Sequence, residues 1–351
     1  MAKYELKGRP FDIKGAKNVE DCKTAEEVIN KAGLNWDVEK VPIYAKASYA
    51  NSSTGELAEN LQYLHDNDGN IFAPINGLYS TIRTDVNYPL GIVTKSYEIV
   101  QNDEAFAFFN KAIGKNKAIW QTAGTFGNGQ RIFVSAKLPN NITIKGDPID
   151  NYLVFTNNHD GTGGVRILFT PIRVICQNTL NAAIRNSTNY VSYRHSSKVH
   201  DDIDVADQIL GICNDITDNI KEEFTKLTTI NISDDKAAEI FAKVILDNKD
   251  IQSMKEQELS IKRLAEGNVL TAHAADISTR KFNSLYKLNE YYHEGIGQKE
   301  IEGTAWGVYN AVTGYFSNVN TSKDDKRMDS LLYGNMSKKI KEVSYELLAI
   351  A

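Results

Sequence analysis

Residues 151–181 limit the folds open to this chain more than any other stretch. Two runs of β-branched, aromatic and aliphatic residues flank the Gly-rich segment 159–164, HDGTGG. Glycines supply the positive φ angles that tight turns need, so this pattern predicts an antiparallel hairpin. Thr170 and Pro171 then have the form of an N-cap followed by proline at the first helical position. The predicted order is therefore strand, turn, strand, helix.

Elsewhere in residues 1–200, short apolar runs alternate with turn residues, as in a meandering sheet. Gly127-Asn128-Gly129-Gln130 is a hairpin signal between two of these runs. Strands are predicted over 38–45, 78–84, 90–94, 97–100, 119–123, 131–138 and 189–195, and helices over 24–33 and 103–113.

The apolar period changes beyond residue 201 to three and four residues, which is typical of amphipathic helices. Helices are predicted over 203–227, after Ser233, and over 251–265, 274–293, 304–317 and 336–348. The aromatic stripe through Trp306 and Tyr309 is interpreted as a packing seam of this half, with a subunit contact as the alternative.

The fold class that follows is α+β, with a β-rich N-terminal half built on an antiparallel sheet with a few helices, followed by a helical C-terminal half. We expect three parts: an N-terminal arm and short helix over 1–33, an α+β sheet domain over 34–200, and a helical domain over 201–351.

Composition points to a folded, non-membrane protein. The 42% hydrophobic content suits a chain with a sizeable core, and no apolar run approaches the roughly 20 residues that span a bilayer. The N-terminus lacks the apolar core of a signal peptide. Cys22, Cys176 and Cys213 are far apart and form no C-x-x-C pair, which favours a reducing compartment. We therefore expect a cytoplasmic protein without a disulfide framework.

Positive charge is concentrated in the middle of a chain whose net charge is −5. Residues 111–200 hold 11 Lys and Arg against 3 Asp and Glu, a balance of 11 − 3 = +8. A surface of that sign attracts polyanions such as nucleic-acid phosphates. This expectation requires that the Lys and Arg residues that lie close together in the sequence also lie together on one exposed face of the folded protein.

Two motifs in that basic segment suit nucleic acid. On the predicted Pro171 helix, Arg173, Gln177, Asn181 and Arg185 recur at i+4 with Asn178 beside them, and such a stripe of guanidinium and amide donors fits phosphates and base edges. The alternative is that these groups only bond neighbouring loops.

The strand 189–195 interleaves Tyr190 and Tyr193 with Arg194, and Lys198 follows, a pattern that suits base stacking and backbone contacts, although tyrosines also favour strands for packing alone. The predicted nucleic-acid-binding set is Arg131, Lys137, Arg166, Arg173, Gln177, Asn178, Asn181, Arg185, Tyr190, Tyr193, Arg194 and Lys198.

Catalytic and metal chemistry are less well supported. His159 and Asp160 on the Gly-rich turn, with Arg166, could form an enzyme or ligand pocket, but turn chemistry explains the first two equally well. The spacing of His195 and His200 matches no standard metal motif, and the glycine-rich segments follow no nucleotide-binding order. We assign no catalytic residue, metal or cofactor.

The segments LNWDVE (34–39), YEIVQN (97–102) and GTAWGVYNAV (303–312), taken with 151–181, resemble the phage/plasmid-like protein family known as domain of unknown function 932. The resemblance runs from about Leu34 to Asn318. It implies a bacterial host cytoplasm and a role in mobile-element DNA metabolism, and it brings no catalytic residue.

The leading hypothesis is a nucleic-acid-binding protein of a phage or plasmid, a single-strand annealing protein or a recombination or replication accessory, with single-stranded DNA as partner and a homo-oligomeric assembly. Two alternatives stay open. One is an enzyme or small-ligand-binding protein with a pocket around His159, Asp160 and Arg166, and the other is an interaction or anti-defence protein acting on host proteins.

Overall fold

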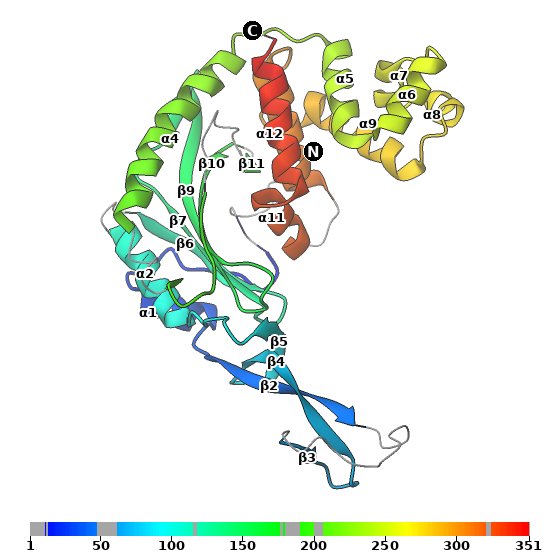
Figure 1. The fold of residues 1–351 in the computed structure, drawn as a ribbon. Helices are drawn as coiled ribbons and strands as arrows, with labels where there is room; N and C mark the ends of the chain where they lie inside the picture. The colour runs from blue at the N-terminus through cyan, green and yellow to red at the C-terminus, as the bar shows by residue number, and fades with distance from the viewer. Residues whose placement is uncertain are drawn as a thin grey trace.

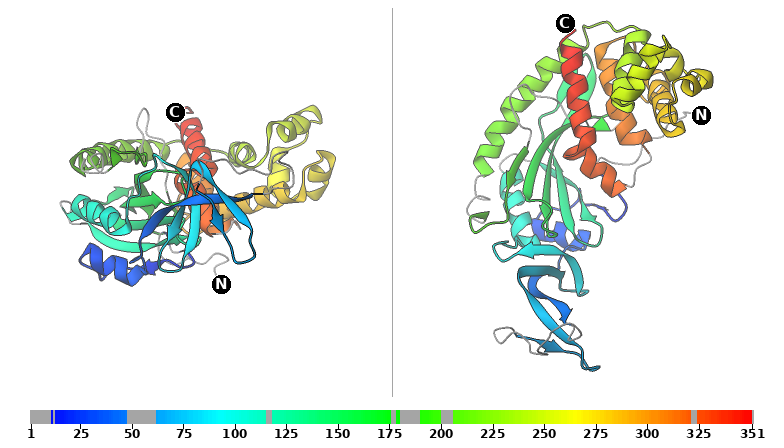
Figure 2. Two further views of the ribbon diagram at one scale, coloured as in Figure 1. Left: turned by 60° about the horizontal axis from the view of Figure 1, so that its bottom comes forward. Right: turned by 45° about the vertical axis from the view of Figure 1, so that its right-hand side comes forward.

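The structure is a computed structural model that describes residues 11, 13–47, 62–114, 118–175, 178–179, 190–199, 206–320 and 324–350. Antiparallel sheets occupy the N-terminal half and helices the C-terminal half, which confirms the predicted α+β class. A large sheet forms the body, a narrow sheet projects from one end of it, and helices gather at the other end (Figures 1 and 2).

The large sheet contains eight strands among the described residues, in the order β1-β6-β7-β9-β10-β11, with β8 paired to β9 and β12 to β10. All of these pairings are antiparallel. The predicted hairpins at 127–130 and 159–164 are confirmed as β6-β7 and β9-β10. The strands are β1 (Lys17–Asn18), β6 (Ile119–Phe126), β7 (Arg131–Lys137), β8 (Ile142–Ile144), β9 (Asp147–Asn158), β10 (Val165–Arg173), β11 (Asn178–Thr179) and β12 (Tyr190–Tyr193).

Both faces of this sheet are covered, but by different parts of the chain. On one face, Val134, Phe155 and Ile167 are at most 1% exposed and join the core that includes residues of α1 (Ala25–Ala32), α2 (Asn102–Gly114) and α4 (Ala206–Leu227). On the other face, Phe133 and Leu168 pack with Met328 of α11 (Asp324–Leu332). Figure 1 shows α2 and α4 on one side of the sheet and α11 and α12 on the other.

The narrow sheet is built around the central strand β4 and projects from the body (Figure 1). We call this sheet the arm. Its strands are β2 (Val38–Ala47), β3 (Leu64–His65), β4 (Ile71–Arg83) and β5 (Tyr88–Thr94). At the base of the arm, Thr81 Oγ1 donates to His159 O at 2.6 Å. A Cβ on Gly91 would lie 2.3 Å from Asp160 O, so only glycine permits the close approach of arm and body.

The strand predicted over 97–100 is wrong, because this segment has no regular structure. Its backbone groups are bonded by scattered partners instead of a ladder. Lys40 Nζ donates to Tyr97 O, Glu98 N donates to His195 O, and Asn157 Nδ2 donates to Val100 O.

The helix predicted after Thr170 is also wrong, because β10 continues through Pro171 to Arg173. Pro171 pairs with Asn151 of β9 on one side. On its other side Pro171 faces no described strand, because β12 pairs with residues 165–168 and β11 with residues 172–173. The missing backbone N–H of proline therefore leaves no described strand without a donor. Sheet pairing therefore overrides the local Thr-Pro helix signal.

The C-terminal half is helical as predicted, with different boundaries. The continuous helix over 251–265 is wrong: Glu258 adopts φ 52° between α6 and α7, and Ser260 caps the second helix by accepting from Arg263 N at 3.2 Å. Helix α11 was not predicted. The remaining helices are α5 (Asp234–Ile245), α6 (Asn248–Glu256), α7 (Ile261–Ala265), α8 (Val269–Ala274), α9 (Thr279–Glu294), α10 (Ala305–Gly314) with the π-helical turn η2 (Tyr315–Val319), and α12 (Asn335–Leu348).

The aromatic stripe of α10 is a core seam. Trp306 and Tyr309 are at most 1% exposed and pack on Phe224 of α4 with ring centroids 4.8 and 5.6 Å apart. This packing places α10 in the core that also covers the sheet.

Candidate nucleic-acid interface

The end of the large sheet nearest the arm brings several of the predicted residues together. Arg131 on β7 pairs with Asn158 on β9, and Arg166 on β10 pairs with Thr156 on β9 and with Ser192 on β12. Paired residues and alternate residues of a strand share a face, so Arg131 and Arg166 lie on the same face. They are two strands and two residues apart, about 12 Å between Cα atoms by standard sheet spacings. We call Arg131, Arg166 and Tyr190 the basic rim, and Arg194 and Lys198 follow Tyr190 along the chain beyond the end of β12.

Aromatic rings lie under the two guanidinium groups of the sheet. Arg131 lies 5.6 Å from the ring centroid of Phe126, and Arg166 lies 4.8 Å from that of Tyr333. Tyr333 also meets Tyr190 edge to face at 6.3 Å. A guanidinium held against a ring keeps its donors at its edge, where a ligand oxygen can reach them.

Arg166 carries a positive charge that no described carboxylate neutralises. Arg166 is half-buried, Arg194 and Lys198 are exposed, and none of these three forms an ion pair with a described carboxylate. On the arm side, Arg83 Nη1 donates to Asn128 O at 3.1 Å, beside the start of β7, although Asp85 pairs with this arginine at 2.7 Å.

Tyr333 was not among the predicted residues. It lies just after α11 and is 143 positions from Tyr190 (333 − 190), so no local pattern connects the two. Its hydroxyl lies 3.2 Å from Thr156 Oγ1 of β9, which fixes the ring over the sheet.

Tyr193 does not join Tyr190. Side chains alternate along β12, so Tyr190 and Tyr193 lie on opposite faces. Tyr190 is 39% exposed at the rim, whereas Tyr193 packs against the large core. Only one of the two predicted stacking tyrosines is therefore available on this face.

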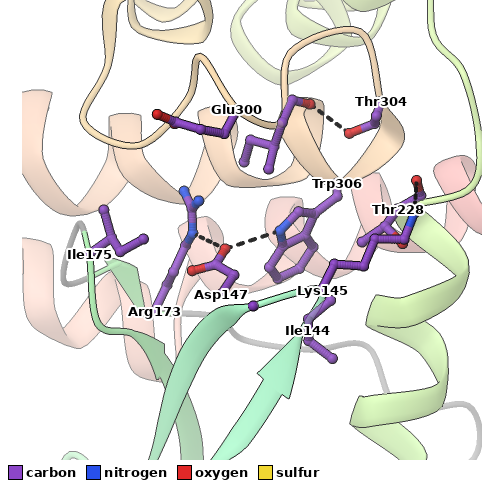
Figure 3. Close-up of a pocket in the computed structure, with 11 residues that line it drawn as sticks. Ile144, Lys145, Asp147, Arg173, Ile175, Thr228, Glu300, Thr304 and Trp306 are labelled. Atoms are coloured by element: carbon purple, nitrogen blue, oxygen red, sulfur yellow. Dashed lines mark hydrogen bonds and ion pairs between the residues drawn. The ribbon is translucent and has the colours of Figure 1, made fainter.

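Arg173 and Lys137 lie away from the rim, and both are neutralised. Lys137, at the far end of β7, pairs with Asp150 at 2.6 Å. Arg173 is 2% exposed, its Nε donates to Asp147 Oδ2 at 2.5 Å, and its Nη2 donates to Gly297 O at 2.9 Å (Figure 3). Each of these two cations is therefore neutralised by an ion pair, partly buried for Lys137 and buried for Arg173, and neither is available for the predicted interface.

The predicted helical stripe is wrong at its first member, since Arg173 belongs to a strand. The side chain of Asn178, in β11, and the residues Gln177, Asn181 and Arg185 lie outside what the structure describes. The continuous cationic face expected from linear clustering is therefore not formed by the described residues, and a smaller rim takes its place.

The alternative pocket around His159, Asp160 and Arg166 is not assembled either. His159 is fully buried, and the Asp160 carboxylate accepts from Thr162 N at 2.9 Å. Arg166 contacts Tyr333 on the sheet face opposite to His159. The three side chains do not converge on one cavity.

His159 supports the junction of arm, sheet and helix. The Asn102 amide nitrogen donates to Leu34 O and Trp36 O, so its Oδ1 accepts from His159 Nε2 at 2.9 Å. Burial, with a smaller contribution from His195, lowers the pKa of His159 to about 3. The imidazole is therefore neutral at pH 7 and serves as a structural donor.

This depressed pKa predicts a pH dependence of stability. The unfolded chain takes up a proton on His159 below its ordinary pKa of 6.5, whereas the native state does so only near 3. The free energy of unfolding should therefore fall by up to about 1.4 kcal/mol per pH unit as the pH drops below 6.5. Urea titrations from about pH 7 to about pH 5 measure this slope above most carboxylate titration.

The comparison for that slope uses two histidine variants. His159→Gln is expected to flatten the dependence, while substitution of the exposed His273 by glutamine should leave it as in the parent chain. Equal slopes in the parent and His159→Gln would show that His159 is not the group responsible.

Two kinds of feature are absent among the described residues, namely a cluster of three or more metal-ligating side chains and a helix able to cross a bilayer. Among those residues, no three or more His, Cys, Asp and Glu side chains group in a way that could hold a metal ion. None of the helices described has the length and apolar character needed to cross a bilayer.

The fold and the rim define an α+β protein whose antiparallel sheet carries an arginine–aromatic cluster at its arm end. The model of the family described as Domain of unknown function (DUF932) matches residues 89–333, more than half of the chain. The protein therefore belongs to that family, as the sequence motifs predicted. No curated protein and no solved structure matches it.

Proposed function

We propose that this protein binds single-stranded nucleic acid, with single-stranded DNA as the partner, along the basic rim. The observation that carries the proposal is the arrangement of Arg166, which lies over Tyr333, pairs with no described carboxylate, and shares its sheet face with Arg131. The family match supports the fold alone and carries no chemistry.

The chemistry of the rim suits an unpaired strand. Guanidinium groups present forked donors that match phosphate oxygens, and exposed tyrosine rings offer a surface on which any base can stack. Tyr190 is 39% exposed and lies beside this cationic row. Bases of a duplex are already stacked on each other, so an exposed ring beside cationic groups favours a single strand.

We place this activity in phage or plasmid DNA metabolism, as single-strand annealing or as an accessory of recombination or replication. The support is an architectural analogy, since a sheet backed by helices is a common scaffold for such proteins. A homo-oligomer on the DNA belongs to the same proposal.

Fluorescence anisotropy with labelled oligodeoxythymidylate, its RNA counterpart and a DNA duplex tests the proposal. We expect the single strand to bind more tightly than the duplex, and the affinity to fall linearly on logarithmic axes between about 50 and 200 mM salt. An absence of binding at the lower salt, or binding that salt does not change, would remove the nucleic-acid hypothesis.

Arg166→Gln is expected to lower the magnitude of the salt slope by about 0.7 for each phosphate that the variant no longer neutralises. The same measurement on Arg263→Gln provides the control, because Arg263 is an exposed arginine of α7 at the far end of the molecule (Figure 1). If both variants keep the parent slope, Arg166 does not bind a phosphate.

A further inference from the structure

A cavity lies outside the rim, where the sheet meets the helices. Its volume of 420 Å³ falls in the roughly 300–1,000 Å³ range of small-molecule pockets. Its lining includes Ile144, Lys145, Asp147, Ile175, Glu300 and Ile301. We call it the Asp147 pocket (Figure 3). Neither the family match nor the nucleic-acid proposal uses it.

The buried charges of the pocket leave one acceptor unused. Asp147 Oδ2 accepts from Arg173 Nε at 2.5 Å and from Trp306 Nε1 at 3.3 Å. The other carboxylate oxygen, Oδ1, makes no hydrogen bond within the described part of the chain, although the side chain of Asp147 is only 9% exposed. This oxygen has essentially no accessible surface, so a ligand atom in the pocket does not reach it and it stays unpaired at a cost to stability.

Two opposite charges lie on opposite sides of the same pocket, as Figure 3 shows for Glu300 and Lys145. They form no ion pair with each other, and Glu300 pairs with no described cation. Lys145 Nζ donates to Thr228 O at 3.2 Å, which leaves two of its N–H groups for another acceptor. A molecule that carries both charges can therefore satisfy both sides at once.

Lys145 occupies a backbone position that does not favour lysine. It has φ 48° and Gly146 has φ 87°, so the two residues that join β8 to β9 form a turn with two positive φ angles. Asn-Gly is the preferred pair for such turns, and a long side chain is disfavoured at the first position. Asparagine could therefore replace Lys145 without loss of the turn.

We propose that the Asp147 pocket binds a small zwitterion with an apolar side chain, the chemistry shared by a free amino acid and a short peptide. Its ammonium group lies at Glu300, and its carboxylate lies at Lys145. The apolar side chain contacts the isoleucines of the wall, Ile144, Ile175 and Ile301. This site is independent of the basic rim.

Isothermal titration calorimetry on the full chain tests the proposal with L-phenylalanine and glycyl-L-phenylalanine, whose relative affinities separate the two sources. Phenethylamine lacks the carboxylate and 3-phenylpropionate lacks the ammonium group. Each of these is expected to bind at least about tenfold more weakly than the better zwitterion, because one charge-assisted hydrogen bond is missing. Equal binding of a truncated analogue, or no binding by either zwitterion, would overturn the proposal.

The matched variants separate ligand binding from folding. Lys145→Asn and Glu300→Gln are each expected to weaken the better zwitterion about tenfold or more. Lys145→Asn should melt at the parent temperature or above it, because asparagine suits the turn. Lys249→Asn, at an exposed lysine of α6, is the control and should bind like the parent chain. Parent affinity in Lys145→Asn, or tighter binding of adenosine than of either zwitterion, would reject this ligand class.

Discussion

Asp147→Ala is expected to lower the free energy of unfolding by about 3–5 kcal/mol, because it leaves the Arg173 guanidinium buried without its carboxylate. Arg173 is 2% exposed and its Nε donates to Asp147, while Gly297 O accepts from its Nη2. Trp306 Nε1 loses its acceptor at the same time. Urea denaturation measures the change from the shift in midpoint at constant slope.

The control for this loss lies on the same strand. Asp150→Ala removes the partner of Lys137, but that lysine is 38% exposed and water can replace the carboxylate, so we expect a change of about 0–1 kcal/mol. The double variant Asp147→Leu with Arg173→Met is expected to recover much of the loss, since it removes both charges. A small effect of Asp147→Ala would mean that water reaches Arg173 in solution.

The Asp147–Arg173 ion pair shows why part of the fold could be predicted from the sequence and part of the site could not. The hairpins at 127–130 and 159–164, the α1 start at Thr24 and the long helix after 201 all follow from local chemistry, and all are present. Thr24 Oγ1, for example, accepts from Glu27 N at 3.2 Å as an N-cap should.

Pro171 marks the limit of local reasoning. A Thr-Pro pair starts helices well, but the backbone here is fixed by pairing with β9, whose residues come about 20 positions earlier in the chain. Once 171–173 is a strand, the i+4 stripe loses its geometric basis. Arg173 then projects toward Asp147 and is buried, an ion pair that its neighbours in sequence do not indicate.

The clustering of Lys and Arg along the sequence predicted the rim only in part, for a similar reason. Arg131 and Arg166 share a face because of strand register, which the hairpin patterns allowed, whereas Lys137 meets Asp150 through the same register and is neutralised. Tyr333 reaches the rim from the C-terminal helices, so only tertiary structure reveals it.

Tyr190→Ala is expected to weaken binding of oligodeoxythymidylate by about 1–3 kcal/mol, or roughly 5- to 150-fold, if one base stacks on this ring. Tyr190 is 39% exposed and is the tyrosine of β12 on the rim face. Tyr190→Phe keeps the ring and should retain most of the affinity. Anisotropy titrations at one fixed salt concentration measure the difference.

Tyr345→Ala provides the matched control, because Tyr345 is 44% exposed on α12 and lies outside the rim. The rings of Tyr190 and Tyr333 meet at 6.3 Å and Arg166 lies over Tyr333, so Tyr190→Ala and Arg166→Gln should not be additive in the double variant. Strict additivity would indicate that the two residues act at separate points on the strand. Parent affinity in Tyr190→Ala, with Arg166→Gln still weakened, would leave the rim as a phosphate-binding surface without base stacking.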